Sequence, residues 1–132
     1  MKAAAPLVVV AAVIEEDGKF LIAQRLQGTH LEGFWEFPGG KVHQGETAEA
    51  ALAREIKEEL GTEIIELRWI FRTSHTYPER TVDLHFFRGS LTGAPRALLG
   101  QHLRWVDRAD LATVDFPAAD AELVANLLHA RL

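Results

Sequence analysis

The chain has 132 residues, 48% hydrophobic and 25% charged, which suits one soluble globular domain and is too short for two ordinary ones. Its formal net charge of −5 argues against general electrostatic binding to a nucleic acid polymer, so any phosphate binding must be local. No cysteine is present, which excludes disulfides, thiolate metal sites and a cysteine nucleophile. We predict one domain over residues 1–132, located in the reducing cytoplasm.

The chain begins with an apolar, valine-rich stretch over residues 1–14. A secretory signal would follow such a run with a small-residue cleavage site, whereas Glu15, Glu16 and Asp17 follow here. No apolar stretch reaches the length of a membrane span, so we expect no membrane partner. The β-branched residues instead predict a buried strand over residues 7–15.

Turn residues divide the next stretch into short extended elements. Asp17-Gly18 predicts a hairpin whose second strand covers residues 19–25. A loop over 26–33 and a short extended piece over 34–37 lead to Gly39-Gly40. This glycine pair predicts a turn that needs the conformational freedom of glycine.

A helix is predicted over residues 48–60, which are rich in strong helix formers. Thr47 has the side chain of an N-cap, and Gly61 has the backbone freedom of a C-terminal cap. Apolar residues recur every four positions and form the predicted core stripe: Leu52, Ile56 and Leu60.

Glu55, Glu58 and Glu59 lie close together on this helix, because positions i, i+3 and i+4 share one face. Like charges so placed repel, and the last helical turn is the negative end of the helix dipole, which disfavours acids. Such a conflict between local rules is expected at a functional site, and a bound divalent cation would reverse both penalties. The alternative is a solvated face with ordinary pairing, such as Arg54 with Glu58.

The second half of the chain predicts strands over 63–72, 81–91 and 103–106, followed by a helix over 118–132. Strands separated by two helices indicate an α/β fold with a mixed sheet between helical layers. The tryptophans are more typical of a core than of base-stacking platforms: Trp35, Trp69 and Trp105.

The residues over 40–62 resemble the Nudix box. The matching positions are Gly40, five residues, Glu46, seven residues, Arg54-Glu55-Ile56, one residue, Glu58-Glu59, one residue, Gly61. Thr62 departs from the bulky aliphatic of that pattern, which affects packing rather than chemistry. The resemblance covers nearly the whole chain and points to the MutT subfamily, through Arg25, His30, Phe37-Pro38-Gly39-Gly40-Lys41 and Asp115-Phe116-Pro117.

This resemblance implies a Nudix fold, an α/β/α sandwich, and a Mg²⁺-dependent nucleoside triphosphate pyrophosphohydrolase, with Mn²⁺ as a substitute. The best-known members hydrolyse 8-oxo-dGTP to 8-oxo-dGMP and pyrophosphate. This removes the oxidised nucleotide from the nucleotide pool and avoids mutation of DNA. The implied reaction is attack of a metal-activated water on a phosphorus of the triphosphate, favoured at the β position. Mg²⁺ prefers oxygen ligands and keeps several waters, which suits a few glutamates together with substrate phosphates.

The resemblance also implies roles for individual residues. The implied metal ligands are the Gly39 carbonyl, Glu55, Glu58 and Glu59, with Glu55 or Glu59 also serving as base. Arg54 is implied to orient Glu55, and Glu46 to support the loop before the helix. The implied substrate-binding residues are Arg25, His30, Glu36, Phe37, Pro38, Gly39, Lys41 and Asp120.

Two positions depart from the subfamily. Leu99 stands where relatives usually carry a glutamate before a Gly-Gln or His-Gln pair, so the base must come from the helix or from a residue such as His102. Asp120 stands where the 8-oxo-dGTP enzyme has an asparagine that reads the purine edge. Relatives that act on cytidine nucleotides carry an acid there, as do some other purine sanitisers. A protonated aspartic acid can both donate and accept a hydrogen bond.

We expect an 8-oxo-dGTP diphosphatase. Asp120 leaves open a CTP/dCTP-type or broad-range nucleotide pyrophosphatase, and Leu99 leaves open a catalytically impaired Nudix-fold binding module. Dinucleotide sugars such as ADP-ribose are less favoured, because the chain lacks room for the extra N-terminal domain that such enzymes often carry. The sequence leaves open the preferred base, the number of metals, and the choice between monomer and homodimer.

Overall fold

The computed structural model describes residues 5–132, so residues 1–4 of the apolar start lie outside the described range. Its elements in chain order are β1 (Leu7–Val13), β2 (Glu15–Glu16), β3 (Lys19–Gln24), β4 (Trp35–Glu36), β5 (Gly39–Lys41), α1 (Ala48–Leu60), β6 (Ile64–Thr76), β7 (Thr81–Leu91), β8 (Leu103–Asp107), the 3-10 helices η1 (Arg108–Thr113) and η2 (Ala118–Asp120), and α2 (Ala121–Leu128). Within residues 5–132, no helix has the length and apolar character needed to cross a membrane.

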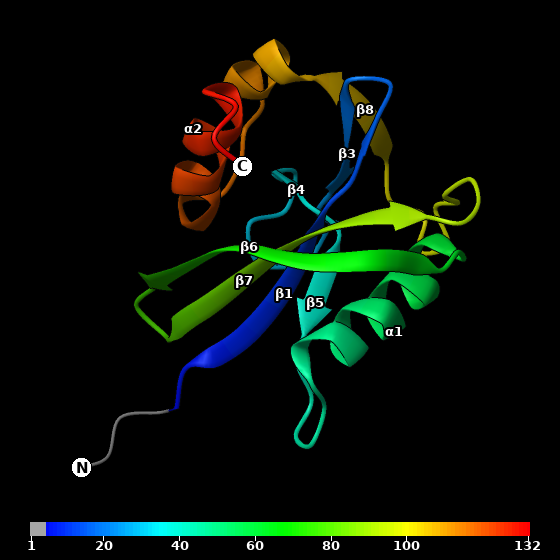
Figure 1. Ribbon diagram of the computed structural model, residues 1–132. Helices are drawn as coiled ribbons and strands as arrows, with labels where there is room; N and C mark the ends of the chain where they lie inside the picture. Colours follow the sequence, from blue (N-terminus) through cyan, green and yellow to red (C-terminus); the bar gives the residue numbers. More distant parts are fainter. Residues whose placement is uncertain (1–4) are drawn as a thin grey trace.

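The strands form two four-stranded sheets, and the helices flank them. The first sheet has the order β5-β1-β7-β6, in which β1 and β7 are parallel and the other pairs antiparallel. In the second sheet β3 lies between β2 and β4 and also pairs with β8. Figure 1 shows α1 on one side of the long strands and α2 on the other. The predicted α/β fold with a mixed sheet between helices is confirmed.

Alternation along the central strands builds the core on both faces of the first sheet, since successive side chains of a strand point to opposite faces. Val10 on β1 and Phe87 on β7 pack in the cluster that contains α1. Their neighbours Ala11 and Phe86 pack in the cluster that contains α2. Full burial of such a large apolar side chain contributes about 2 kcal/mol, so the two helices are held against the sheet mainly by these faces.

Helix α1 has the predicted bounds and caps. The Thr47 hydroxyl accepts a hydrogen bond from the Ala50 N–H at 3.1 Å, which satisfies one of the free amides at the helix start. Gly61 ends the helix in the left-handed region at φ 67°, where glycine has no steric penalty. The predicted core stripe is buried: Leu52, Ile56 and Leu60.

Gly39 and Gly40 lie in strand β5, so the predicted turn is wrong. Neither has a positive φ. A Cβ at Gly39 would lie 2.0 Å from the Val10 carbonyl oxygen, and one at Gly40 would lie 2.3 Å from the carboxyl carbon of Glu55. Glycine is therefore required here because β1 and α1 approach β5 closely.

Other differences have local causes. Strand β6 continues to Thr76, four residues beyond its predicted end, because it pairs with β7 as far as Thr81. The C-terminal helix begins as the 3-10 turn η2 and stops at Leu128, and Ala130 has a positive φ of 54°. The prediction of a core position is wrong for Trp69, whose side chain is 53% exposed. The remaining predicted strand ends differ by one or two residues.

Candidate active site

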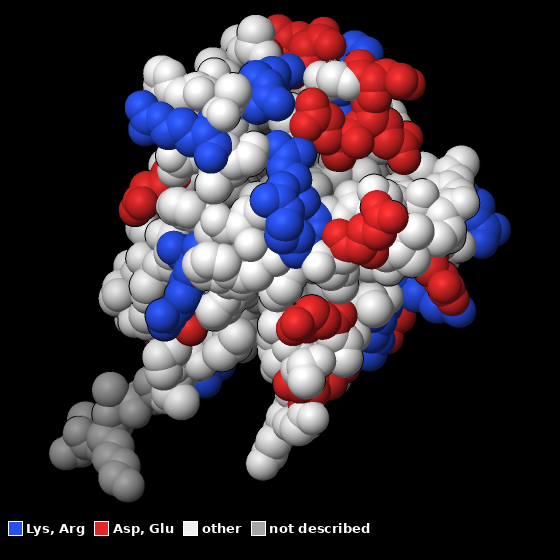
Figure 2. Space-filling model, viewed as in Figure 1, with Lys and Arg blue, Asp and Glu red and all other residues white. Residues whose placement is uncertain are grey.

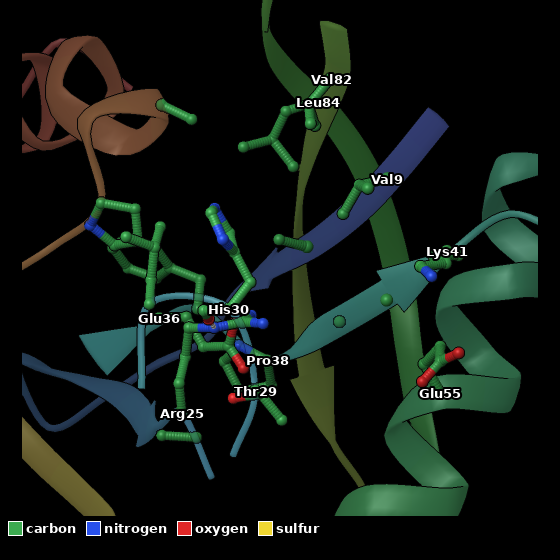
Figure 3. A pocket seen from close by; sticks show the side chains of 18 of the residues that line it. Val9, Arg25, Thr29, His30, Glu36, Pro38, Lys41, Glu55, Val82 and Leu84 are labelled. Atoms are coloured by element: carbon green, nitrogen blue, oxygen red, sulfur yellow. Dashed lines mark hydrogen bonds and ion pairs between the residues drawn. The ribbon is translucent and has the colours of Figure 1, made fainter. Parts of the chain in front are cut away.

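A cavity of about 730 Å³ opens between the first sheet, helix α1 and the loops near η2, a size typical of small-molecule sites. Ten of the residues predicted to bind metal or substrate line it: Arg25, His30, Glu36, Phe37, Pro38, Gly39, Lys41, Glu55, Glu59 and Asp120. Figure 3 shows that Lys41 and Glu55 lie at one end of the cavity and that Arg25, His30 and Glu36 gather at the other. Arg54 and Glu58 are not part of its lining.

Arg54 ties helix α1 to the loop and strand that precede it. Its guanidinium donates to both carboxylate oxygens of Glu46, at 2.8 and 3.0 Å, and to the Lys41 carbonyl oxygen at 3.0 Å. It also donates to Glu55 at 2.8 Å. Hydrogen bonds from Arg54, and then from the His43 backbone, lower the pKa of Glu46 to about 2. The Arg54 network therefore fixes the direction of the Glu55 carboxylate from outside the cavity.

Glu55 itself lies tightly against strand β5. Its side chain is 16% exposed, and its carboxylate occupies the space that a side chain at position 40 would take. The close packing against Gly40 explains how a charged side chain on α1 reaches the cavity wall. A carboxylate that accepts hydrogen bonds from one guanidinium and packs against one glycine has free lone pairs for a further ligand.

Glu59 is the least satisfied polar group at this end of the cavity. Its Oε2 atom is buried and has no hydrogen-bond partner within the described residues. Burial, followed by the nearby charges of Glu55 and Glu36, raises the pKa of Glu59 to about 8, although a backbone hydrogen bond from Gly39 opposes this. A buried acceptor without a partner is costly, and either a proton or a cation would relieve it.

Glu58 points away from the cavity. Its side chain is 58% exposed, and its carboxylate lies 3.4 Å from Arg54. Across residues 5–132, no three His, Cys, Asp or Glu side chains are grouped closely enough to hold a metal by themselves. Of the three predicted helix carboxylates, Glu55 and Glu59 line the cavity and Glu58 does not.

Arg25 and Glu36 form an ion pair at the opposite end of the cavity. The Arg25 Nη1 atom lies 2.7 Å from Glu36 Oε2, and both side chains are about three-tenths exposed. Burial raises the pKa of Glu36, while the Arg25 charge lowers it. Arg25 also donates to the His30 carbonyl oxygen, which holds the loop after β3 against the cavity.

Asp120 is buried in the cavity wall, with only 6% of its surface exposed. Burial and the charge of Glu36 raise its pKa to about 7, against the lowering effect of Arg25. A carboxyl with this pKa exists in both protonation states near neutral pH. It can therefore donate as well as accept a hydrogen bond.

The cavity also contains residues that the sequence did not reveal. Tyr77 and Arg80 reach it from the β6–β7 hairpin, and Gln101 reaches it from the loop before β8. The Gln101 side chain accepts from the Leu99 N–H at 2.9 Å and donates to the Glu59 carbonyl oxygen at 3.1 Å. The sequence analysis ended the strand at residue 72, so it did not predict the β6–β7 hairpin. Tyr77 next to Pro78 was the signal in the sequence that could have indicated this turn.

Charges outside the cavity are mostly exposed and mixed in sign. Figure 2 shows basic and acidic side chains next to one another on one face of the molecule. Arg72 pairs with Asp83 at 2.8 Å and Lys19 with Asp107 at 3.0 Å. An exposed pair such as Lys19 with Asp107 contributes about 0.5 kcal/mol, so it has little weight in stability.

Comparisons with known proteins agree with the resemblance. The family model described as NUDIX domain matches residues 9–126. The 8-oxo-dGTP diphosphatase of Haemophilus influenzae is 36% identical and covers 92% of this chain and 90% of its own length. The CTP pyrophosphohydrolase of Escherichia coli is also 36% identical, over 87% of this chain and 84% of its own. A solved MutT structure, from a comparison of Aliivibrio salmonicida and Vibrio cholerae, has a TM-score of 0.79 at 31% identity and covers 93% and 96% of the two chains.

Proposed function

The chain belongs to the Nudix hydrolase family, and from its cavity we propose that it is a Mg²⁺-dependent nucleoside triphosphate pyrophosphohydrolase that acts on 8-oxo-dGTP. The observation that carries the proposal is the buried Oε2 atom of Glu59, which has no hydrogen-bond partner among the described residues. Glu59 and Glu55 both line the cavity. Two acidic groups this close favour a cation between them.

The donor set fits a hard divalent cation, because Mg²⁺ takes carboxylate and carbonyl oxygens and completes its shell with water and substrate phosphates. The residues at the cavity that would hold it are Glu55, Glu59 and the Gly39 carbonyl. Glu58, which pairs with Arg54 at the surface, would have to turn toward the cavity to join them. When bound, the cation supplies positive charge to the phosphates and lowers the pKa of a water. The need for substrate oxygens agrees with the described residues, among which no three acidic or histidine side chains are grouped closely enough to hold a metal by themselves.

The protein's own residues then carry the rest of the chemistry. Glu55 or Glu59 accepts the proton of the attacking water, and Arg54 keeps Glu55 oriented through its 2.8 Å ion pair. Lys41 lies at the same end and is available to bind phosphate oxygens. Arg25 has further donors beyond those it uses for Glu36 and His30, so it can bind a phosphate while remaining paired.

Asp120 supports the choice of 8-oxo-dGTP. An oxidised guanine presents both donor and acceptor groups on its edge, and a protonated carboxyl can satisfy one of each. The raised pKa of Asp120, about 7, makes that protonated form available near neutral pH.

A CTP-type pyrophosphatase is the second candidate. The E. coli relative named CTP pyrophosphohydrolase has the same identity to this chain as the H. influenzae relative named 8-oxo-dGTP diphosphatase. An ionised Asp120 would accept a hydrogen bond from an amino group, which cytosine offers and oxidised guanine also carries.

A panel of nucleoside triphosphates with Mg²⁺, scored by kcat/KM for monophosphate release, tests the proposal. We expect 8-oxo-dGTP to give the highest value and to release pyrophosphate. Higher kcat/KM for CTP or dCTP would replace the substrate assignment. Absence of hydrolysis for the whole panel, combined with no Mn²⁺ binding by calorimetry, would favour the non-catalytic binding module.

Three further properties stay predictions from the sequence. They are a single domain over residues 1–132, a cytoplasmic location, and a monomeric or homodimeric state. Size-exclusion chromatography with light scattering would settle the last of these.

A further inference from the structure

Tyr77 stands where three segments of the chain meet at the cavity. It precedes a tight turn in which the Tyr77 N–H donates to the Arg80 carbonyl oxygen at 2.9 Å and the Arg80 N–H donates back at 3.2 Å. This paired turn fixes the backbone from which the ring projects. Tyr77 lines the cavity, and it is the only tyrosine in the chain.

The Tyr77 ring packs against the loop that follows β3. Its centroid lies 5.2 Å from that of His30, and the two rings are nearly perpendicular at 87°. His75, near the end of β6, also packs against Tyr77, with ring centroids 4.5 Å apart and an angle of 64° between the rings. Edge-to-face pairs of this kind contribute to packing beyond their buried area, so Tyr77 supports His30, which is otherwise on an exposed loop.

The Tyr77 hydroxyl meets the start of the C-terminal helical segment. Tyr77 packs against the apolar cluster that contains Ala119, and both residues line the cavity. Burial and then the Asp120 charge raise the pKa of the Tyr77 hydroxyl, and the Ala119 backbone lowers it. Ala119 directly precedes Asp120 in η2, and the Asp120 charge acts on the Tyr77 hydroxyl. The hairpin is thereby connected to the backbone that carries Asp120.

We propose that Tyr77 is a positioning residue for base recognition, which holds His30 and Asp120 in one rigid wall around the nucleobase. The inference rests on the proposed function, because it concerns how that same cavity selects a base. Its ligand is the nucleobase of a nucleoside phosphate. The edge of the base would form hydrogen bonds with side chains whose positions must stay fixed. A side chain that moves by a fraction of an ångström loses directional hydrogen bonds before it loses apolar contact.

Two variants in the same hairpin separate positioning from general stability. Tyr77→Phe keeps the ring and removes only the hydroxyl contact with Ala119. Thr76→Val is the matched control: it also removes a hydroxyl, one that lies 3.0 Å from the Thr81 hydroxyl at an exposed site and does not line the cavity.

For Tyr77→Phe we expect an unchanged Tm and kcat, and a kcat/KM for 8-oxo-dGTP that falls about fivefold while that for dTTP does not change. Thr76→Val should match the wild type with both nucleotides. Equal kcat/KM values of Tyr77→Phe and Thr76→Val for 8-oxo-dGTP would overturn the inference. So would a uniform loss with both nucleotides, because that would indicate damage to the whole site.

Binding of the monophosphate 8-oxo-dGMP, measured by calorimetry without metal, keeps this test separate from the proposed function. If the wild type binds 8-oxo-dGMP but hydrolyses no triphosphate, the proposed function fails, and weaker binding by Tyr77→Phe would still support the positioning role. No binding by the wild type would overturn the inference.

A second readout needs no nucleotide. The phenol of Tyr77 titrates in the absorbance spectrum, and Asp120→Asn should lower the pKa of this phenol because the Asp120 charge raises it. An unchanged titration would also count against the link.

Discussion

The two ends of the cavity are built in different ways. The end proposed to bind metal, here called the metal end, comes from one contiguous segment, β5, the following loop and α1, over residues 39–61. The end proposed to bind the nucleobase, here called the base end, is assembled from four separate places: the loop after β3, strand β4, the β6–β7 hairpin and η2. Figure 3 shows the two groups apart, with Glu55 on α1 and with Arg25, His30 and Glu36 together on the other side of Pro38.

Their electrostatics differ as well. At the metal end Arg54 makes hydrogen bonds to Glu46 and Glu55 that set those carboxylates before any ligand arrives. At the base end Arg25 is paired with Glu36, and both Glu36 and Asp120 have a raised pKa. Under the proposed function, the reaction type would depend on geometry within one segment, whereas base choice would depend on contacts between distant segments.

Glu59→Gln should have the largest effect, because glutamine cannot take the anionic form that Glu59 would adopt when a cation displaces its proton. We expect kcat to fall about a thousandfold, since a cation held less firmly stabilises less of the developing phosphate charge. Mn²⁺ affinity measured by calorimetry should fall in parallel. Glu49→Gln, an exposed acid on the same helix, is the control and should behave like the wild type. Near-normal turnover in Glu59→Gln would remove the basis for placing the chemistry on α1.

Arg54→Met should have the next largest effect, although Arg54 does not line the cavity. It would release Glu46 and leave Glu55 unoriented, and loss of such supporting contacts typically costs about a hundredfold in activity or metal affinity. Steady-state kcat/KM and Mn²⁺ binding would measure this. Arg72→Met is the matched control, because it breaks an exposed ion pair with Asp83 on the surface. Equal activity of the two variants would show that the Arg54 network does not preset the metal end.

Asp120→Asn tests the base end through pH. In the wild type, kcat/KM for 8-oxo-dGTP should decline above pH 7 as the carboxyl, whose pKa is about 7, loses its proton and can no longer donate. The amide of Asn keeps its donor at all pH values, so the variant should retain about tenfold more of its activity at pH 8. The measurement is the ratio of kcat/KM at about pH 6 and about pH 8, roughly one unit on either side of this pKa. An identical decline in both proteins would exclude Asp120 as the titrating group.

The same substitution changes stability with a definite sign. The pKa of Asp120 rises from its usual 3.8 to about 7 on folding, so the folded state holds the proton more tightly than the unfolded state. Its contribution to the free energy of unfolding is therefore full below pH 3.8 and is lost as pH rises to 7. Urea midpoints across this range should fall more steeply for the wild type than for Asp120→Asn. If the urea midpoints of the two proteins change with pH at the same slope, Asp120 is not the buried group that takes up the proton.

The sequence predicted helix α1 well because its signals are local. Helix caps, the spacing of Glu55 and Glu59 and the apolar stripe all fall within one helix, where i, i+3 and i+4 geometry is fixed. The failure at the metal end was Gly39-Gly40, since the close approach of Glu55 to Gly40 is a tertiary contact that no local pattern reveals. Glu58 failed to reach the cavity because Arg54 offers it a partner at the surface.

The base end could be predicted only in part. Arg25, His30 and Asp120 were found through resemblance, but their contacts with Glu36 and Tyr77 join residues far apart in the chain. Strand propensity does not fix where an edge strand stops, so the hairpin that carries Tyr77 was missing from the prediction. Its end is set instead by the ladder that pairs β6 with β7.

Leu99→Glu should have the smallest effect and shows whether the metal end is complete. Leu99 lines the cavity with half of its surface exposed, so a glutamate fits there without a buried-charge penalty. If Glu55 and Glu59 already supply the base, an added acid should raise kcat by less than about threefold, because a second base of similar strength adds little proton-transfer rate. Leu98→Glu, equally exposed but outside the cavity lining, is the control. A gain of about a hundredfold would mean that α1 alone does not supply a sufficient base. The metal end would then need a residue from the loop before β8 as well.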